Sequence, residues 1–162
     1  MTKIKPQVVD DYEFLDFNNK KVKLSQLFGN KKDLILVHNM GTGCKYCTMW
    51  ADGFTGVLPH LEDRAAFVVV SNDSTSLQKK FHKSRKWNFK MVSASQNSFT
   101  KDMKMGTADE PMPGVSTFYK NGNKIFRVGK DKFGPGDKYC ITWHFFDLLK
   151  NGSDSWEPKY RY

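Results

Sequence analysis

The chain has 162 residues, and 26 Lys or Arg against 17 Asp or Glu give a formal net charge of +9. Its 39% hydrophobic and 27% charged residues are typical of a globular domain. No apolar run approaches the roughly 20 residues that cross a bilayer, and no apolar signal segment follows the basic N-terminus. Three cysteines are too few for a disulfide scaffold. We therefore expect one cytoplasmic domain over residues 1–162, with residues 1–9 flexible, and no membrane association.

Along the chain, the side-chain pattern predicts a mixed sheet with helices between its strands. Strands are expected at residues 12–17, 21–24, 34–37, 67–71, 91–93, 115–119 and 124–128. Helices are expected at residues 25–28, 44–58, 74–86, 98–104 and 140–150. The first two strands flank Asn18-Asn19 and form an N-terminal β-hairpin, and Asn121-Gly122 indicates a second hairpin. The strand–helix order between them indicates parallel crossovers, so the fold class is α/β with a central mixed sheet flanked by helices.

The densest basic segment lies in the predicted helix 74–86. Its basic residues are Lys79, Lys80, His82, Lys83, Arg85 and Lys86. Leu77 and Phe81 stand four apart and give this helix one apolar stripe, so the basic residues are expected to form a solvated face. Because no nucleic-acid-binding motif accompanies them, nucleic acid is not an expected partner.

The sharpest chemical signal is Cys44-Lys45-Tyr46-Cys47, which follows a buried strand and begins a helix. This context is typical of a redox dithiol, because the spacing puts both sulfurs on one helical turn where a disulfide can close. The helix N-terminus and Lys45 favour a thiolate, so Cys44 is the expected nucleophile. Cys47 lies deeper and is expected to resolve the mixed disulfide. The alternative is a pair of packed, inert cysteines.

Other side chains could serve this cysteine pair. Cys140 and His144 share one face of the last predicted helix and could complete a Cys₃His zinc set with Cys44 and Cys47. A buried helix face explains them more simply, so no metal and no cofactor are expected. His38 ends the preceding strand, and it is either a proton acceptor for Cys47 beneath the dithiol or a core histidine.

The predicted helix 44–58 carries four further candidates for lining the site: Lys45, Tyr46, Trp50 and Asp52. Trp50 either shields the sulfurs or, more simply, fills the core. Asp52 is either a surface charge or a polar anchor, and the sequence does not decide between the two.

The strand–loop–CxxC–helix unit resembles the thioredoxin-like superfamily. Five segments together look like the family called "domain of unknown function 899", whose members are described as predicted dithiol–disulfide oxidoreductases. These segments are Cys44–Phe54, Pro59–Leu61, Phe67–Ser71, Pro113–Ser116 and Trp156–Tyr160. The resemblance extends from about Val9 to Tyr162. It implies a thioredoxin-like fold and thiol–disulfide exchange with a protein or small-molecule partner. A redox-inactive or zinc-bound binding module is the alternative, and the oligomeric state is left open.

The sequence also departs from the superfamily pattern. Thioredoxins have an acidic residue six positions before the first cysteine, where this chain has His38. They place a cis-proline before the strand that faces the dithiol, a position that falls near Gly114. Pro113, Gly114 and Val115 are therefore candidate lining residues, and the isomer of the Met112–Pro113 bond is left open. The peroxiredoxin motif Pro-x-x-x-Thr/Ser-x-x-Cys is absent, which disfavours a peroxidase of that type.

Overall fold

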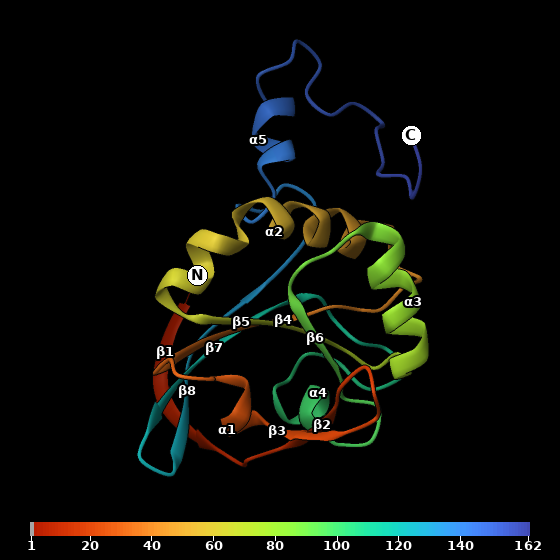
Figure 1. Cartoon of the computed structure of the whole chain (residues 1–162). Helices are drawn as coiled ribbons and strands as arrows, with labels where there is room; N and C mark the ends of the chain where they lie inside the picture. Colours follow the sequence, from red (N-terminus) through yellow and green to blue (C-terminus); the bar gives the residue numbers. More distant parts are fainter. Residues whose placement is uncertain (1) are drawn as a thin grey trace.

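The computed structural model describes residues 2–162, which form an eight-stranded mixed sheet with helices on both faces (Figure 1). The strands are β1 (Thr2–Val9), β2 (Glu13–Leu15), β3 (Lys21–Lys23), β4 (Asp33–His38), β5 (Ala66–Ser71), β6 (Lys90–Ser93), β7 (Gly114–Asn121) and β8 (Lys124–Lys132). The helices are α1 (Leu24–Leu27), α2 (Lys45–Arg64), α3 (Thr75–Arg85), α4 (Phe99–Asp102) and α5 (Ile141–Phe146). The predicted fold class is confirmed, and β2 and β3 form the expected hairpin.

The strand order β1-β8-β7-β4-β5-β6-β2-β3 places β4 near the middle of the sheet. It pairs in parallel with β5 and antiparallel with β7, so both of its edges are hydrogen-bonded. Its side chains alternate between two cores: Leu34 and Leu36 face one, and Ile35 and Val37 face the other. Burial on both faces explains the unbroken apolar run that marks this strand in the sequence.

Residues 2–9 correct one expectation, because they form an edge strand rather than a flexible segment. Strand β1 pairs antiparallel with β8, and its register shifts between Lys3 and Gln7. Pro6 lies within this shift, at a sheet edge, where a missing N–H is tolerated. The segment carries little apolar periodicity, so its structure comes from the open edge of β8 rather than from a local pattern. Met1 lies outside the described residues.

Helix α2 is longer than expected, because it continues through Pro59 to Arg64. A proline inside a helix leaves the carbonyl four residues earlier without its N–H partner. That carbonyl belongs to Thr55, and the Asn88 side chain donates to it at 3.4 Å. Helix α5 is shorter than expected and ends at Phe146.

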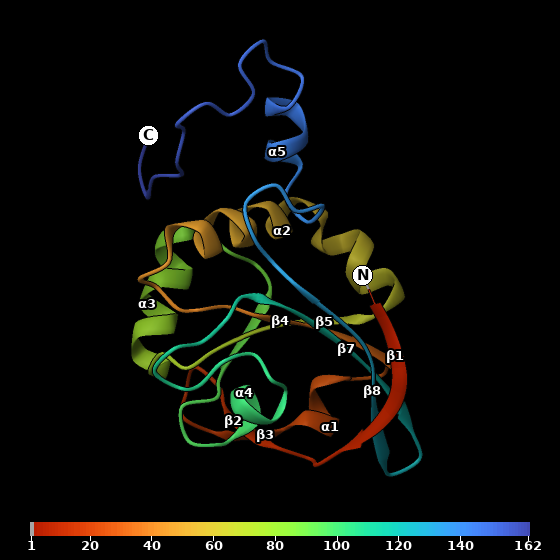
Figure 2. The same cartoon turned by 180° about the vertical axis from the view of Figure 1, so that it is seen from behind.

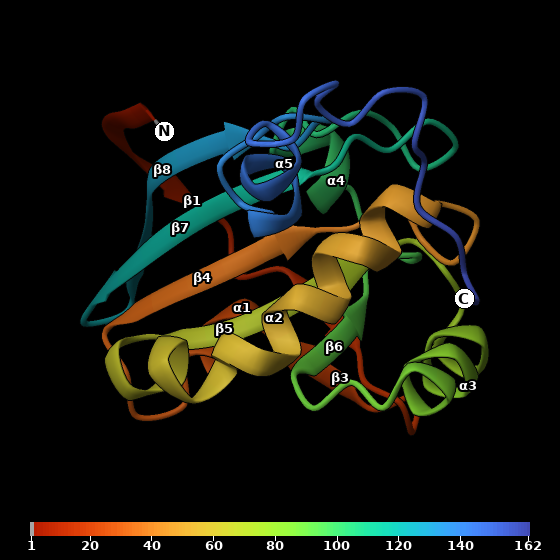
Figure 3. The same cartoon turned by 90° about the horizontal axis from the view of Figure 1, so that it is seen from above.

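Helices α2 and α5 and the C-terminal tail define the face of the molecule that carries the cysteines. Helix α2 crosses over β4 and β5, while α1 and α4 cover the opposite face (Figures 1 and 3). Helix α5 projects beyond α2, and the tail then runs toward α3 (Figures 2 and 3). Within residues 2–162, no helix has the length and apolar character needed to span a membrane.

Candidate dithiol site

The cysteine pair lies at the N-terminus of α2, one short loop after β4. Cys44 has extended backbone angles and is the N-cap residue, so its side chain takes the position that usually satisfies an orphan helix N–H. The Cys47 N–H donates to Cys44 Sγ at 3.0 Å. Cys44 is half-buried, whereas Cys47 is 2% exposed and packs in the core under α2. Both are free thiols.

The two thiols differ strongly in acidity. The Cys47 side chain donates a hydrogen bond that, with the backbone N–H groups of Cys47 and Tyr46, outweighs burial and lowers the pKa of Cys44 to about 7. The neighbouring Cys44 sulfur and burial raise the pKa of Cys47. Near neutral pH a large fraction of Cys44 is therefore a thiolate, while Cys47 stays a buried thiol hydrogen-bonded to it.

The loop before Cys44 is fixed by two polar side chains that the sequence analysis did not single out. Asn39 accepts the Gly41 N–H at 2.8 Å and donates to the Cys47 carbonyl at 3.4 Å. Asp73 accepts the Thr42 N–H at 2.8 Å. Gly41 has φ +101°, and a Cβ there would lie 2.8 Å from the Asp73 carboxylate oxygens. This position therefore requires glycine for both its backbone conformation and its close approach.

His38 lies on the other face of the sheet from Cys47, which does not fit the interpretation of a proton acceptor beneath the dithiol. Val37 packs in the same core as Cys47, and side chains alternate along β4, so the next residue points away. The His38 ring stacks on Phe99, and its Nε2 lies 2.8 Å from Ser116 Oγ. Burial, and then the charge of Arg127, lower its pKa to about 3. Of the two interpretations left open, the contacts fit a core histidine, bonded to a side chain rather than to backbone.

Lys45 and Tyr46 contact the C-terminal tail. Lys45 forms an ion pair with Glu157, and Tyr46 Oη donates to the same carboxylate at 3.4 Å. Further along, Tyr160 Oη donates to the Thr42 carbonyl at 3.0 Å. Burial, and then the negative charge of the nearby cysteines, raise the pKa of Tyr160. The tail thus borders the dithiol. In the sequence, Trp156–Tyr160 stood out only as one of the five segments of the family resemblance.

Trp50 and Asp52 have structural contacts. Trp50 is 3% exposed, lies in the core, and donates from Nε1 to Asp137 at 3.3 Å. Asp52 pairs with the Arg85 guanidinium and accepts the Trp87 indole N–H at 2.8 Å. It is therefore a polar anchor that joins α2 to the end of α3, and one residue of the basic segment is engaged in this ion pair.

The start of β7 lies beside β4, the strand that precedes the dithiol. It carries Gly114 and Val115, and Pro113 comes directly before it. Gly114 pairs with His38, and Val115 packs in the same core as Cys47. A Cβ on Gly114 would lie 2.3 Å from the Asp131 carbonyl oxygen, so the neighbouring strand excludes any side chain here. The Pro113 carbonyl accepts the Phe133 N–H at 3.0 Å. Between residues 2 and 162 no peptide bond is cis, so Met112–Pro113 is trans.

The structure does not bring the alternative zinc ligands together. Cys140 is buried at the start of α5, whereas His144 is exposed on that helix. Among the described residues, no three His, Cys, Asp or Glu side chains are arranged to hold a metal ion.

Residues 5–161 match the family described as "Bacterial protein of unknown function (DUF899)". The chain belongs to this family. The match spans β1 to the C-terminal tail and so includes the cysteine pair and the segment that borders it. A search of curated protein sequences finds no match to this DUF899 chain.

Solved structures similar to the DUF899 chain include several peroxiredoxins. Peroxidoxin BcpB from Mycobacterium tuberculosis superposes with a TM-score of 0.63 and 23% identity over 83% of this chain and 89% of that chain. The mitochondrial 2-Cys peroxiredoxin from Plasmodium falciparum gives a TM-score of 0.58 and 17% identity over 82% of this chain and 81% of that chain. A bacterioferritin comigratory protein from Xanthomonas campestris gives a TM-score of 0.58 and 16% identity over 75% of this chain and 80% of that chain. These similarities confirm the thioredoxin-like fold.

Proposed function

We propose that this DUF899 protein is a thiol–disulfide oxidoreductase that uses Cys44 as nucleophile and Cys47 as resolving thiol. The observation that carries the proposal is the N-cap position of Cys44, with its sulfur held by the Cys47 N–H at 3.0 Å and its pKa lowered to about 7. A thiol with a pKa near ambient pH is the best attacking group in disulfide exchange. Inert structural cysteines are buried and lack this activation.

The reaction would proceed in two exchange steps. The Cys44 thiolate attacks one sulfur of a substrate disulfide, so a mixed disulfide forms, the substrate S–S bond breaks, and a substrate thiolate leaves and takes up a proton. Cys47 then loses its proton to solvent and attacks Cys44 Sγ, which forms the Cys44–Cys47 disulfide and releases the second substrate thiolate. The substrate gains two electrons, and an external dithiol must return two electrons to the protein. His38 faces the other side of the sheet, so solvent is the simpler proton acceptor.

Peroxide reduction is a second candidate, because the structural neighbours are peroxiredoxins and one is described by its alkyl peroxide reduction activity. Here the Cys44 thiolate would attack one peroxide oxygen, so that an S–O bond forms, the O–O bond breaks, and the leaving alkoxide takes up a proton and departs as an alcohol. Cys47 would then displace water from the sulfenic acid and close the same disulfide. The loop before Cys44 lacks the peroxiredoxin motif, so we rank disulfide exchange first.

Single-cysteine variants test both reactions. We expect Cys44→Ser to abolish reduction of insulin disulfides in the presence of a dithiol, and Cys47→Ser to accumulate a mixed disulfide at Cys44 visible by mass spectrometry. Cys140→Ser is the matched control, because that thiol is buried at the start of α5, and it should retain turnover. Full activity in Cys44→Ser would contradict the proposal. Turnover with alkyl hydroperoxide but not with insulin would favour the second candidate.

A further inference from the structure

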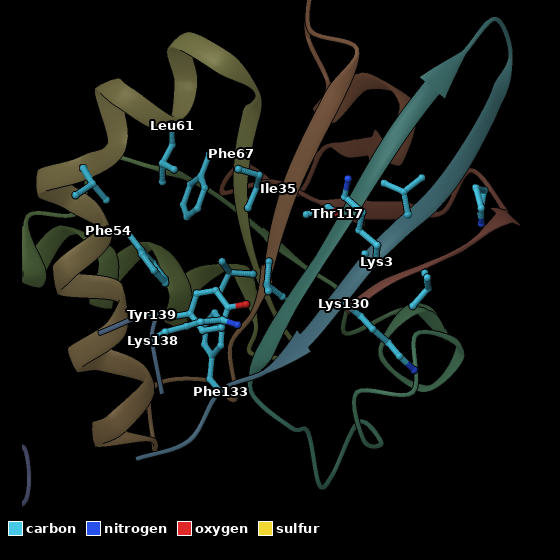
Figure 4. A pocket seen from close by; sticks show the side chains of 17 residues that line it. Lys3, Ile35, Phe54, Leu61, Phe67, Thr117, Lys130, Phe133, Lys138 and Tyr139 are labelled. Carbon is cyan, nitrogen blue, oxygen red and sulfur yellow. The ribbon is translucent and has the colours of Figure 1, made fainter. Parts of the chain in front are cut away.

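An apolar cavity lies between α2 and the β4–β7–β8 part of the sheet, and neither redox cysteine is among its described lining residues (Figure 4). Its volume is about 700 Å³, which falls in the range of small-molecule sites. Phe54 and Leu61 of α2 lie on one side, and Ile35 of β4 and Thr117 of β7 lie on the other. Phe54 also contacts Phe67 of β5, with ring centroids 5.4 Å apart, so the cavity lies beside the contact between α2 and the sheet.

The sequence and the topology together explain why this space is open and apolar. Phe54, Val57 and Leu61 are spaced three and four residues apart, so they share one face of α2. On the sheet, Ile35 and Val37 alternate to the same side of β4. Helix α5, which follows β8 in the chain, projects beyond α2 instead of lying beside it (Figures 1 and 2).

The charged residues that line the cavity are all lysines: Lys3, Lys130 and Lys138. Lys138 Nζ lies 3.5 Å from Oδ2 of Asp131, a residue that does not line the cavity. The same nitrogen lies 5.7 Å from the centroid of the Tyr139 ring.

Lys3 is exposed, and no acidic side chain within residues 2–162 forms an ion pair with it. Its partner in the sheet is Gly129, which pairs with Thr117, so Lys3 shares the cavity side of the sheet with Thr117. Lys130 pairs with Ser116 instead, so its side chain points to the opposite side. The cavity thus combines apolar walls with an excess of positive charge at its edge.

We propose that this cavity binds a free long-chain carboxylic acid. The alkyl chain would lie between α2 and the sheet, where each methylene group leaves water, and the carboxylate would lie beside Lys3. A cationic amphiphile would meet only like charge among the lining residues. A small polar ligand would leave the apolar walls hydrated and gain little from them. This proposal does not depend on the dithiol chemistry, because the cysteines do not line the site.

Calorimetric titration with three ligands that share one chain tests the proposal. Decanoate, 1-decanol and decyltrimethylammonium each have a chain of ten carbons and differ in the group at its end. We expect decanoate to bind most tightly, 1-decanol about tenfold more weakly, and the cation without measurable heat. Lys3→Gln should reduce decanoate affinity toward that of 1-decanol while leaving 1-decanol binding unchanged. Lys130→Gln, on the opposite side of the sheet, is the matched control and should leave decanoate binding unchanged. Equal affinity for all three ligands, or no binding of any, would overturn the proposal.

Val57 supplies a matched pair of variants that leaves the lysines intact. It lines the cavity but is 46% exposed, so both substitutions keep a solvated side chain on the helix. Val57→Glu should weaken decanoate about tenfold, whereas Val57→Lys should keep or increase affinity. Equal weakening in both variants would show that charge does not select the ligand. Sedimentation of the ligand-free protein provides another test, because a stable dimer that excludes decanoate would assign the cavity to a second copy of the chain.

Discussion

Acidification should destabilise this protein through His38, a buried histidine that is neutral in the folded state. The ring is 4% exposed, lies 2.8 Å from Ser116 Oγ and stacks on Phe99. Burial, and then the charge of Arg127, lower its pKa to about 3 from an ordinary value of 6.5. Between these two values the unfolded chain binds a proton that the folded chain does not. Stability contributed by His38 is therefore complete above about pH 6.5 and decreases as the pH falls.

The size of the effect follows from the two pKa values. Within the window, each pH unit removes about 1.4 kcal/mol of unfolding free energy. Between pH 8 and pH 4.5, His38 alone accounts for about 3 kcal/mol, calculated from a folded pKa of about 3 and an unfolded pKa of 6.5. This is a large part of the roughly 5–15 kcal/mol that stabilises a typical domain.

Urea unfolding at several pH values, followed by fluorescence, measures this contribution when wild type is compared with His38→Gln. The glutamine does not titrate, while the carboxylates that also lose stability in acid remain in both proteins. We expect wild type to lose about 3 kcal/mol more than the variant between pH 8 and pH 4.5. Parallel pH profiles for the two proteins would refute the reasoning, because they would mean that His38 titrates alike in both states.

Three further changes have defined outcomes. Alkylation of Cys44 by iodoacetamide should increase with a midpoint near pH 7, and Cys47→Ala should move the midpoint upward because it removes the main hydrogen bond to the thiolate; an unchanged midpoint would exclude that cause. Asp52→Ala should cost about 1–2 kcal/mol in urea unfolding, whereas Asp52→Asn, which keeps an acceptor for the Trp87 indole, should cost less. Gly41→Ala should cost about 1–3 kcal/mol, and the control Gly43→Ala, with open space around it, should cost far less; equal losses would show that the loop adapts.

The sequence was sufficient where the determining interactions are local. The apolar run of β4 reflects burial on both faces, and the spacing of Cys44 and Cys47 places both sulfurs on the first turn of α2. The hairpin of β2 and β3 follows from alternation around a two-asparagine turn. These patterns predicted the mixed sheet and the position of the candidate site.

The remainder depends on contacts between segments that are distant in sequence. The sequence correctly predicts that His38 ends β4. Which side of the sheet its side chain faces relative to the dithiol depends on the side on which α2 packs, and no local pattern contains this information. Glu157 and Tyr160 reach the dithiol because the tail returns toward α3. Similarly, β1 forms because β8 offers it an edge, so residues with little strand signal of their own become ordered.

The most direct test of the dithiol proposal is a redox titration of the full chain in a glutathione series, with mass spectrometry of the peptide that contains Cys44 and Cys47. We predict a reversible two-electron transition with one midpoint, in which these two cysteines form a disulfide and Cys140 stays reduced. The central claim would be contradicted if Cys44 and Cys47 never formed this disulfide across the glutathione series. It would also be contradicted if only one of them reacted, giving a mixed disulfide with glutathione and no bond between the two.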